Sequence, residues 1–155
     1  MRETALWQWL RQGRRAFPAA DLDLSRVENL VQSGMPDVEG CLNGSQFWIE
    51  LKVVKGKNVL RAAFRPAQVP WMRRRWAAGG RAFALLQVDA GPKARRYLVA
   101  APLLGQFVDA PFDEGHLLDA AINPPNILPE GVLRLAAYCG REVATRSRSE
   151  TAPNT

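Results

Sequence analysis

Two carboxylates and a lysine stand in a short stretch of this chain with a spacing that could support phosphodiester hydrolysis. Asp37 closes the run Gly34-Met35-Pro36-Asp37, and Glu50 and Lys52 belong to the triplet Glu50-Leu51-Lys52. Mg²⁺ in proteins typically takes one or two carboxylates together with water and a phosphate. A neighbouring lysine can orient or deprotonate the attacking water, or stabilise charge that develops on phosphorus. We therefore ask whether the fold brings these three side chains together.

The residues between the two acids have the pattern of a β-hairpin. Val38–Leu42 and Gln46–Val54 are rich in β-branched and aromatic residues, and Asn43-Gly44 lies between them. Asn-Gly is the strongest short-range hairpin signal, because both central residues of a type I′ turn need positive φ. A two-residue loop would pair Leu42 with Ser45 and fix the register of the two strands.

Extending that register towards the acids places Asp37 opposite Glu50, with Lys52 diagonal to Asp37 on the same face. The other face is then apolar and suited to a core; it carries Val38, Leu42, Phe47, Ile49, Leu51 and Val53. Like charges directly opposite one another destabilise a sheet, so a cation must compensate. Lys52 alone would give a surface ion pair worth about 0–1 kcal/mol. A divalent metal held by both carboxylates is the alternative that we favour.

These pieces resemble the PD-(D/E)XK nuclease superfamily in Pro36-Asp37 and Glu50-Leu51-Lys52. More narrowly, the region from Leu24 to Val88 resembles small VRR-NUC-like and Holliday-junction-resolvase-like endonucleases, many of them carried by phages. The segments that carry this narrower resemblance are Arg26-Val27-Glu28, Ser33-Gly34-Met35-Pro36-Asp37-Val38 and Arg65-Pro66-Ala67-Gln68. The resemblance implies an α/β fold with a restriction-endonuclease-like core, in which helices flank a central mixed β-sheet.

The same resemblance implies roles for five residues. Asp37 and Glu50 would bind Mg²⁺, with Mn²⁺ as a substitute, and Lys52 would be the catalytic lysine. Many members add an acid from an N-terminal helix, and we expect Glu28 to be this third catalytic acid and metal ligand. Ser25-Arg26-Val27-Glu28 also fits a helix capping box, which would give Glu28 a structural role instead. Gln68 is expected at the site, at the start of the next helix.

A basic segment follows the triplet and contains no acid. The residues expected to bind nucleic acid are Lys55, Lys57, Arg61, Arg65, Arg73, Arg74 and Arg75. The whole chain has 21 Lys and Arg against 15 Asp and Glu, a net charge of +6, so much of the excess lies here. A phosphate backbone suits such a surface, and DNA is the expected partner. A solvated basic helix face is the simpler alternative.

The remaining elements are predicted from periodicity and from Gly and Pro signals. Helices are expected at Glu3–Phe17 and Pro66–Ala78, strands at Ala82–Val88 and Arg95–Ala100, and a helical or extended piece at Arg26–Val31. Short helices are expected at Leu103–Val108 and Gly115–Ile122, with a strand or a helix at Leu133–Tyr138. The order strand, strand, helix, strand, strand is the one expected for the core of these nucleases.

A hydrophobic content of 47% in 155 residues is enough for one buried core. We predict a single nuclease-like domain over residues 1–140 and a disordered C-terminal tail over residues 141–155. The sequence has no signal peptide and no apolar run long enough to span a membrane, so a cytoplasmic location is expected, in the host if a phage encodes the protein.

Three functions fit the sequence. The first is a Mg²⁺-dependent endodeoxyribonuclease, which would be structure-specific if it acts on branched or junction DNA. Resolving a junction would require a homodimer, since it takes two symmetric cuts. The second is a non-catalytic nucleic-acid-binding module on the same fold. The third is a phage regulatory protein whose basic face docks on an acidic partner.

Overall fold

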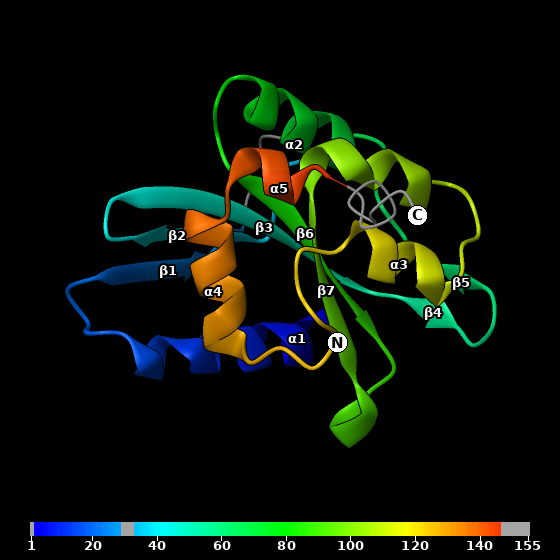
Figure 1. The fold of residues 1–155 in the computed structure, drawn as a ribbon, viewed down its shortest axis with the longest axis horizontal. Helices are drawn as coiled ribbons and strands as arrows, with labels where there is room; N and C mark the ends of the chain where they lie inside the picture. The colour runs from blue at the N-terminus through cyan, green and yellow to red at the C-terminus, as the bar shows by residue number, and fades with distance from the viewer. Residues whose placement is uncertain (1, 29–32, 147–155) are drawn as a thin grey trace, which may run out of the picture.

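A five-stranded mixed sheet organises the chain in the computed structural model, which describes residues 2–28 and 33–146 (Figure 1). Its order is β1-β2-β3-β6-β7, formed by β1 (Leu22–Arg26), β2 (Val38–Leu42), β3 (Ser45–Val53), β6 (Ala82–Val88) and β7 (Arg95–Ala100). Only the central β3–β6 pair is parallel; the other pairs are antiparallel. With helices on both faces, this arrangement confirms the predicted α/β class and is consistent with a restriction-endonuclease-like core.

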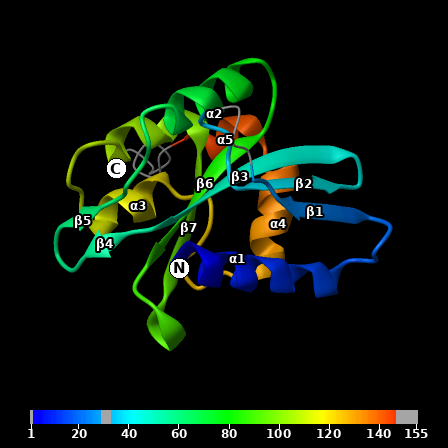
Figure 2. The same ribbon diagram turned by 180° about the vertical axis from the view of Figure 1, so that it is seen from behind.

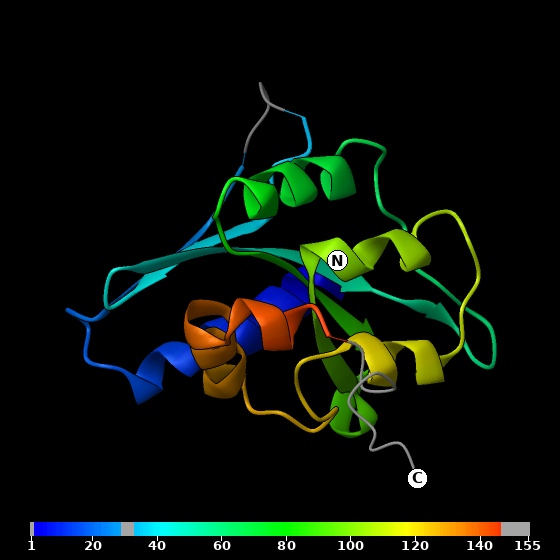
Figure 3. The same cartoon turned by 45° about the horizontal axis from the view of Figure 1, so that its top comes forward.

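The helices cover the two faces of the sheet (Figure 3). On one face lie α1 (Arg2–Arg11), its 3-10 continuation η1 (Gln12–Ala16) and α4 (Pro129–Tyr138). On the other lie α2 (Gln68–Ala77) and the 3-10 helix η3 (Ala101–Phe107). Smaller elements complete the chain: the strands β4 (Lys55–Gly56) and β5 (Leu60–Arg61), η2 (Gly91–Lys93), α3 (Glu114–Ala120) and α5 (Arg141–Ala144). No described helix is both long and apolar enough to cross a bilayer.

The β2–β3 hairpin has the predicted loop and register. Asn43 and Gly44 have φ values of 49° and 84°, as a type I′ turn requires. Leu42 pairs with Ser45, and the ladder ends with Val38 opposite Ile49. The prediction from the Asn-Gly turn is therefore confirmed over the whole length of β2.

The segment from β3 to β6 forms a parallel crossover through α2. The helix begins at Gln68, two residues later than the predicted Pro66, so Pro70 falls in its first turn, where backbone N–H groups have no partner within the helix. Gly79, with a φ of 98°, follows the end of the helix. β6 has the predicted limits and is buried along its whole length, as expected for a strand with helices on both faces.

Three predicted elements differ from the structure. The expected helix Glu3–Phe17 is α-helical only to Arg11 and continues as η1. The piece expected at Arg26–Val31 belongs partly to strand β1, which ends at Arg26, and partly to residues outside the described ranges. The ambiguous Leu133–Tyr138 run is the second half of helix α4.

The predicted disordered tail starts too early. Residues Arg141–Ala144 form α5, and Ala144 is buried. The guanidinium of Arg141 donates to the carbonyls of Gly80 (2.7 Å) and Trp76 (2.5 Å) and lies 4.1 Å from the centre of the Trp76 ring. These contacts with the end of α2 hold α5 on the domain. The rest of the predicted tail, residues 147–155, lies outside the described residues.

Candidate active site

Asp37 lies directly before β2, beside a part of β3 that has no neighbouring strand on this side. The β2–β3 ladder ends at Ile49, whereas β3 continues to pair with β6 as far as Val53. The backbone of β3 beyond Ile49 is therefore open on the β2 side. Asp37 fills part of this edge, because its Oδ2 accepts a hydrogen bond of 3.0 Å from the backbone N–H of Leu51.

Glu50 is buried beside Asp37, with 1% of its surface exposed. Its Oε1 accepts a hydrogen bond of 3.0 Å from Gln68 Nε2 and lies 3.5 Å from Lys52 Nζ. Its Oε2 is buried and has no hydrogen-bond donor among the described residues. A buried carboxylate oxygen without a donor is costly, so this atom calls for a proton or a cation.

The surroundings of Glu50 favour the neutral carboxyl in the metal-free protein. Burial, and after it the neighbouring Asp37, raise the pKa of Glu50 from 4.5 to about 9, against the opposing effect of Lys52. A carboxyl with so high a pKa holds its proton near pH 7. A divalent cation of sufficient affinity would displace that proton.

Lys52 lies between the carboxyl group of Glu50 and the ring of Phe64. Its Nζ is 3.5 Å from Glu50 Oε1 and 5.4 Å from the centre of the Phe64 ring, and the residue is 8% exposed. The face of β3 that carries these groups is covered by α2, since Trp48 packs edge-on against Trp71 at 5.3 Å. Both faces of β3 are therefore buried at Lys52, which also lines the cleft that contains Asp37.

Gln68 connects this group to the loop before α2. Its Oε1 accepts a hydrogen bond of 2.8 Å from the backbone N–H of Arg65, while its amide nitrogen donates to Glu50. The loop that precedes Asp37 also meets α2 here. Gly34 has a φ of 92°, and a Cβ on it would lie 2.4 Å from the carbonyl oxygen of Ala67. Only glycine fits this close approach.

These side chains line a cleft of about 440 Å³. Its walls come from α1, the end of β1, the loop before β2, strand β3 and the start of α2. The lining residues are Glu3, Thr4, Arg26, Val27, Ser33, Gly34, Met35, Asp37, Glu50, Leu51, Lys52, Arg65 and Gln68. Four of the five predicted catalytic residues, Asp37, Glu50, Lys52 and Gln68, thus meet in one cleft.

Glu28, the fifth, does not line the cleft. It is exposed, and its role as a metal ligand stays a prediction. Because Ser25 belongs to strand β1, the alternative of a helix capping box that starts at Ser25 is wrong. The acid that an N-terminal helix brings to the cleft is Glu3, in the first turn of α1. A signal for it existed in the sequence, because Glu3 is the only acid in the helix predicted at Glu3–Phe17.

The donor set fits a hard divalent cation. No group of three or more His, Cys, Asp or Glu residues among the described ones is close enough together to form a metal site by itself. Mg²⁺ does not need such a group, because it commonly binds one or two carboxylates and completes its shell with water and phosphate oxygens. Asp37 and the unpaired Oε2 of Glu50 would supply the protein's oxygen ligands, and Glu3 would add negative charge across the cleft.

The predicted nucleic-acid-binding residues are all exposed and lie in three places. Lys55, Lys57 and Arg61 lie on the β4–β5 hairpin; Arg73, Arg74 and Arg75 lie on the exposed side of α2; Arg65 lines the cleft. Arg75 also packs over the Trp71 ring, 4.7 Å from its centre. Arg26, which the sequence prediction omitted, is a second arginine in the cleft wall.

Comparison with known proteins finds similarity among solved structures. No protein-family model matches the chain, and no curated protein sequence matches it. Among solved structures, the chain is similar to Hjc, a Holliday junction resolvase from the archaeal hyperthermophile Archaeoglobus fulgidus. The two share 19% sequence identity with a TM-score of 0.48, over 72% of this chain and 90% of that one.

Proposed function

We propose that the protein is a Mg²⁺-dependent endonuclease that hydrolyses phosphodiester bonds of DNA in the cleft beside Asp37. The observation that carries this proposal is the buried Oε2 of Glu50, which has no donor among the described residues and lies beside a second carboxylate. A protein that only binds DNA gains nothing from two acids facing phosphates. The acids make sense if a divalent cation lies between them and the substrate.

The residues of the cleft have separate tasks in this mechanism. Asp37 and Glu50 hold the metal, and Mn²⁺ can replace Mg²⁺ because both accept oxygen ligands. When bound, the metal supplies Lewis-acid stabilisation of the negative charge on the reacting phosphate. Glu50 also keeps the ammonium of Lys52 at 3.5 Å, pointing into the cleft, where it orients the attacking water and stabilises developing charge.

Two arginines would position the substrate. Arg26 and Arg65 line the cleft and come from different elements, the end of β1 and the loop before α2. Guanidinium groups bind phosphate oxygens in a bidentate way, so the pair can hold the strand on either side of the reacting phosphate. The exposed cations of α2 and of the β4–β5 hairpin would bind flanking DNA, and affinity should therefore fall steeply as salt rises.

Incubation with DNA tests this function directly. The purified protein is mixed with supercoiled, linear and four-way-junction DNA, in Mg²⁺, in Mn²⁺ and in EDTA. We expect cutting with either metal, none in EDTA, and none by Asp37→Ala or Lys52→Ala at matched folding by circular dichroism. Cutting that survives both substitutions would refute the assignment of the cleft. Binding without cutting, unaffected by either change, would favour a non-catalytic binding module.

Junction cleavage would further require two active sites. We propose a homodimer for this case, since a two-fold axis places two equivalent cuts symmetrically across a branch. Sedimentation equilibrium with and without junction DNA measures this. A monomer in both conditions would leave nicking of one strand as the activity.

A further inference from the structure

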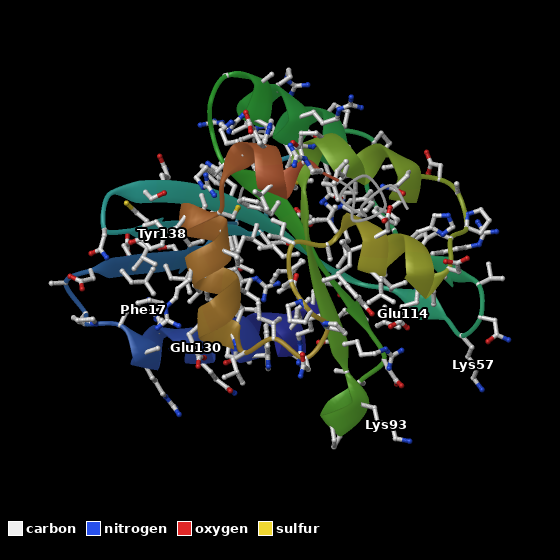
Figure 4. The ribbon with its side chains drawn as sticks, viewed as in Figure 1. Phe17, Lys57, Lys93, Glu114, Glu130 and Tyr138 are labelled. Atoms are coloured by element: carbon white, nitrogen blue, oxygen red, sulfur yellow. The ribbon has the colours of Figure 1, made fainter. Side chains whose placement is uncertain are left out.

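A short exposed hairpin extends directly from the strand that carries the candidate catalytic residues. β3 ends at Val53, and β4 and β5 pair antiparallel, with Lys55 opposite Arg61 and Gly56 opposite Leu60. Residues 55–59 are all exposed. The hairpin lies away from the β2–β3 turn, at the other end of β3 (Figure 2), and Lys57 points outward from its turn (Figure 4).

The hairpin is held rigidly at its base. Leu60 is buried, and its backbone exchanges two hydrogen bonds with Phe112, of 2.7 and 3.0 Å. Phe112 packs in turn against Phe107, with ring centres 4.8 Å apart. Gly56 has a φ of 113°, and a Cβ on it would lie 2.0 Å from the carbonyl oxygen of Val59, so the turn closes tightly on itself. Two-stranded ribbons are marginal alone, and this one depends on these anchors.

The charges of the hairpin repel one another. Lys55 and Arg61 are directly opposed in the ladder, and Lys57 is two residues away. Within the described ranges, no ion pair or side-chain hydrogen bond engages any of these three cations. Like charges in opposed positions destabilise a ribbon. A fold that holds Lys55 and Arg61 opposite each other is suited to an anionic ligand. Nucleic acid is such a ligand, and its groove accommodates a two-stranded ribbon.

The turn of this cationic ribbon also presents one bare apolar side chain. Val59 is 59% exposed and follows Lys57 and Asn58. Single exposed valines are ordinary on protein surfaces. This one differs in being held at the tip of a rigid, positively charged element, which is the setting in which apolar side chains wedge between base steps.

We infer that the β4–β5 hairpin enters the groove of DNA and places Val59 against a base step whose stacking is already broken, so that the protein selects interrupted duplexes: branches, nicks and bulges. This inference rests on the proposed function and names the element and the side chain that would set its preference for interrupted duplexes. Unstacking an intact step costs free energy, whereas a branch point or a nick offers the open step without that cost. Lys55, Lys57 and Arg61 would neutralise the phosphates on either side.

The test compares two valines that are both exposed. Val59→Ala removes the wedge, and Val143→Ala, on α5, removes a valine that is 66% exposed elsewhere. Each variant and the wild type cut a linear duplex and a four-way junction of the same sequence in Mg²⁺. We expect Val59→Ala to lower the ratio of junction to linear cleavage by about fivefold, as partial loss of two methyl contacts predicts, and Val143→Ala to leave it unchanged.

Binding measured without cutting separates this inference from the proposed activity. A 2-aminopurine base at the branch reports how often the open base step restacks, and a side chain wedged in that step, with protein bound in EDTA, would keep the step open. The wild type and Val143→Ala should raise its fluorescence, and Val59→Ala should raise it less. If the wild type never cuts DNA but shows this Val59-dependent signal, the nuclease assignment fails and the wedge stands. A signal and a cleavage ratio that are equal in Val59→Ala and the wild type would overturn the wedge, whatever the protein cuts.

Discussion

Gln68 joins Glu50 to the backbone of the loop before α2. Its Nε2 donates to Glu50 Oε1 over 3.0 Å, and its Oε1 accepts from the N–H of Arg65 over 2.8 Å. Glu50 itself is 1% exposed and Gln68 is 6% exposed, so both hydrogen bonds are shielded from water. One amide therefore fixes the acid relative to the arginine that lines the same cleft.

Replacing this amide should impair catalysis more than substrate binding. Gln68→Ala frees the Glu50 carboxyl and leaves the Arg65 N–H unpaired, and we expect kcat to fall about tenfold with little change in KM. Gln87→Ala is the matched control, because Gln87 is a buried glutamine that accepts a hydrogen bond from Arg96 and does not line the cleft. It should destabilise the fold by a similar amount, about 1–2 kcal/mol, at unchanged kcat. Equal kcat values for the two variants would remove Gln68 from the site.

Replacement of Glu3 and replacement of Glu28 should have different effects on the affinity for Mg²⁺. Glu3 lines the cleft and Glu28 does not. Glu3→Gln should weaken Mg²⁺ binding by roughly tenfold, since the affinity of carboxylate sites follows their charge, while Glu28→Gln should leave it unchanged. Isothermal titration calorimetry with Mg²⁺ measures both. The reverse order of effects would restore Glu28 as the third acid.

The stability of the metal-free protein should depend on pH through Glu50. Its pKa rises from 4.5 in the unfolded chain to about 9 in the fold, so between these values the folded state holds one proton more. The free energy of unfolding should then fall as pH rises through this window, by up to about 1.4 kcal/mol per pH unit. The carboxyl's stabilising contribution is complete below pH 4.5 and lost above pH 9.

Urea unfolding of the wild type and of Glu50→Gln from pH 5 to pH 9 checks this. The stability of the wild type relative to that of Glu50→Gln should fall with rising pH, because the neutral amide does not titrate. Mg²⁺ should stabilise the wild type more at pH 8 than at pH 6, since metal and proton compete for the same carboxyl. A pH-independent difference would mean that Glu50 is already ionised in the fold.

The approach of Gly34 to α2 gives a prediction about stability. Gly34→Ala would force a positive φ and an overlap with the carbonyl of Ala67, and should cost about 2–5 kcal/mol. Gly44→Ala, in the hairpin turn, has a similar φ but no atom within 4 Å of the added Cβ, and should cost about 1–2 kcal/mol. Chemical denaturation ranks the two. Equal losses would show that the backbone angle alone matters at Gly34.

Local signals in the sequence predicted much of the fold. Asn43-Gly44 determined the β2–β3 register because the geometry of a type I′ turn depends only on its own residues. The apolar run Ala82–Val88 predicted the limits of β6, because a strand covered on both faces is apolar along its length. Leu133–Tyr138 stayed ambiguous between strand and helix, since a short apolar run fits either.

Contacts between segments that lie far apart in the chain could not be predicted from the sequence. Glu3 meets β3 only because α1 packs across the sheet. Helix α5 is held on the domain by the hydrogen bonds that Arg141 donates to the carbonyls of Trp76 and Gly80. No local pattern around residue 141 contains that information, and composition alone indicated a disordered tail.

The single parallel pair in the sheet has a consequence for how the cleft forms during folding. β3 can pair with β2 as soon as the Asn43-Gly44 turn closes, but its pairing with β6, which sets Glu50 beside Ala84, closes a loop that contains all of α2. Such non-local pairings are slow, because chain entropy is lost before the contacts form. The acids and Lys52 can thus be aligned early on the hairpin, while Gln68 and Arg65 arrive only with the crossover. We expect the candidate active-site cleft to be among the last parts of the protein to assemble.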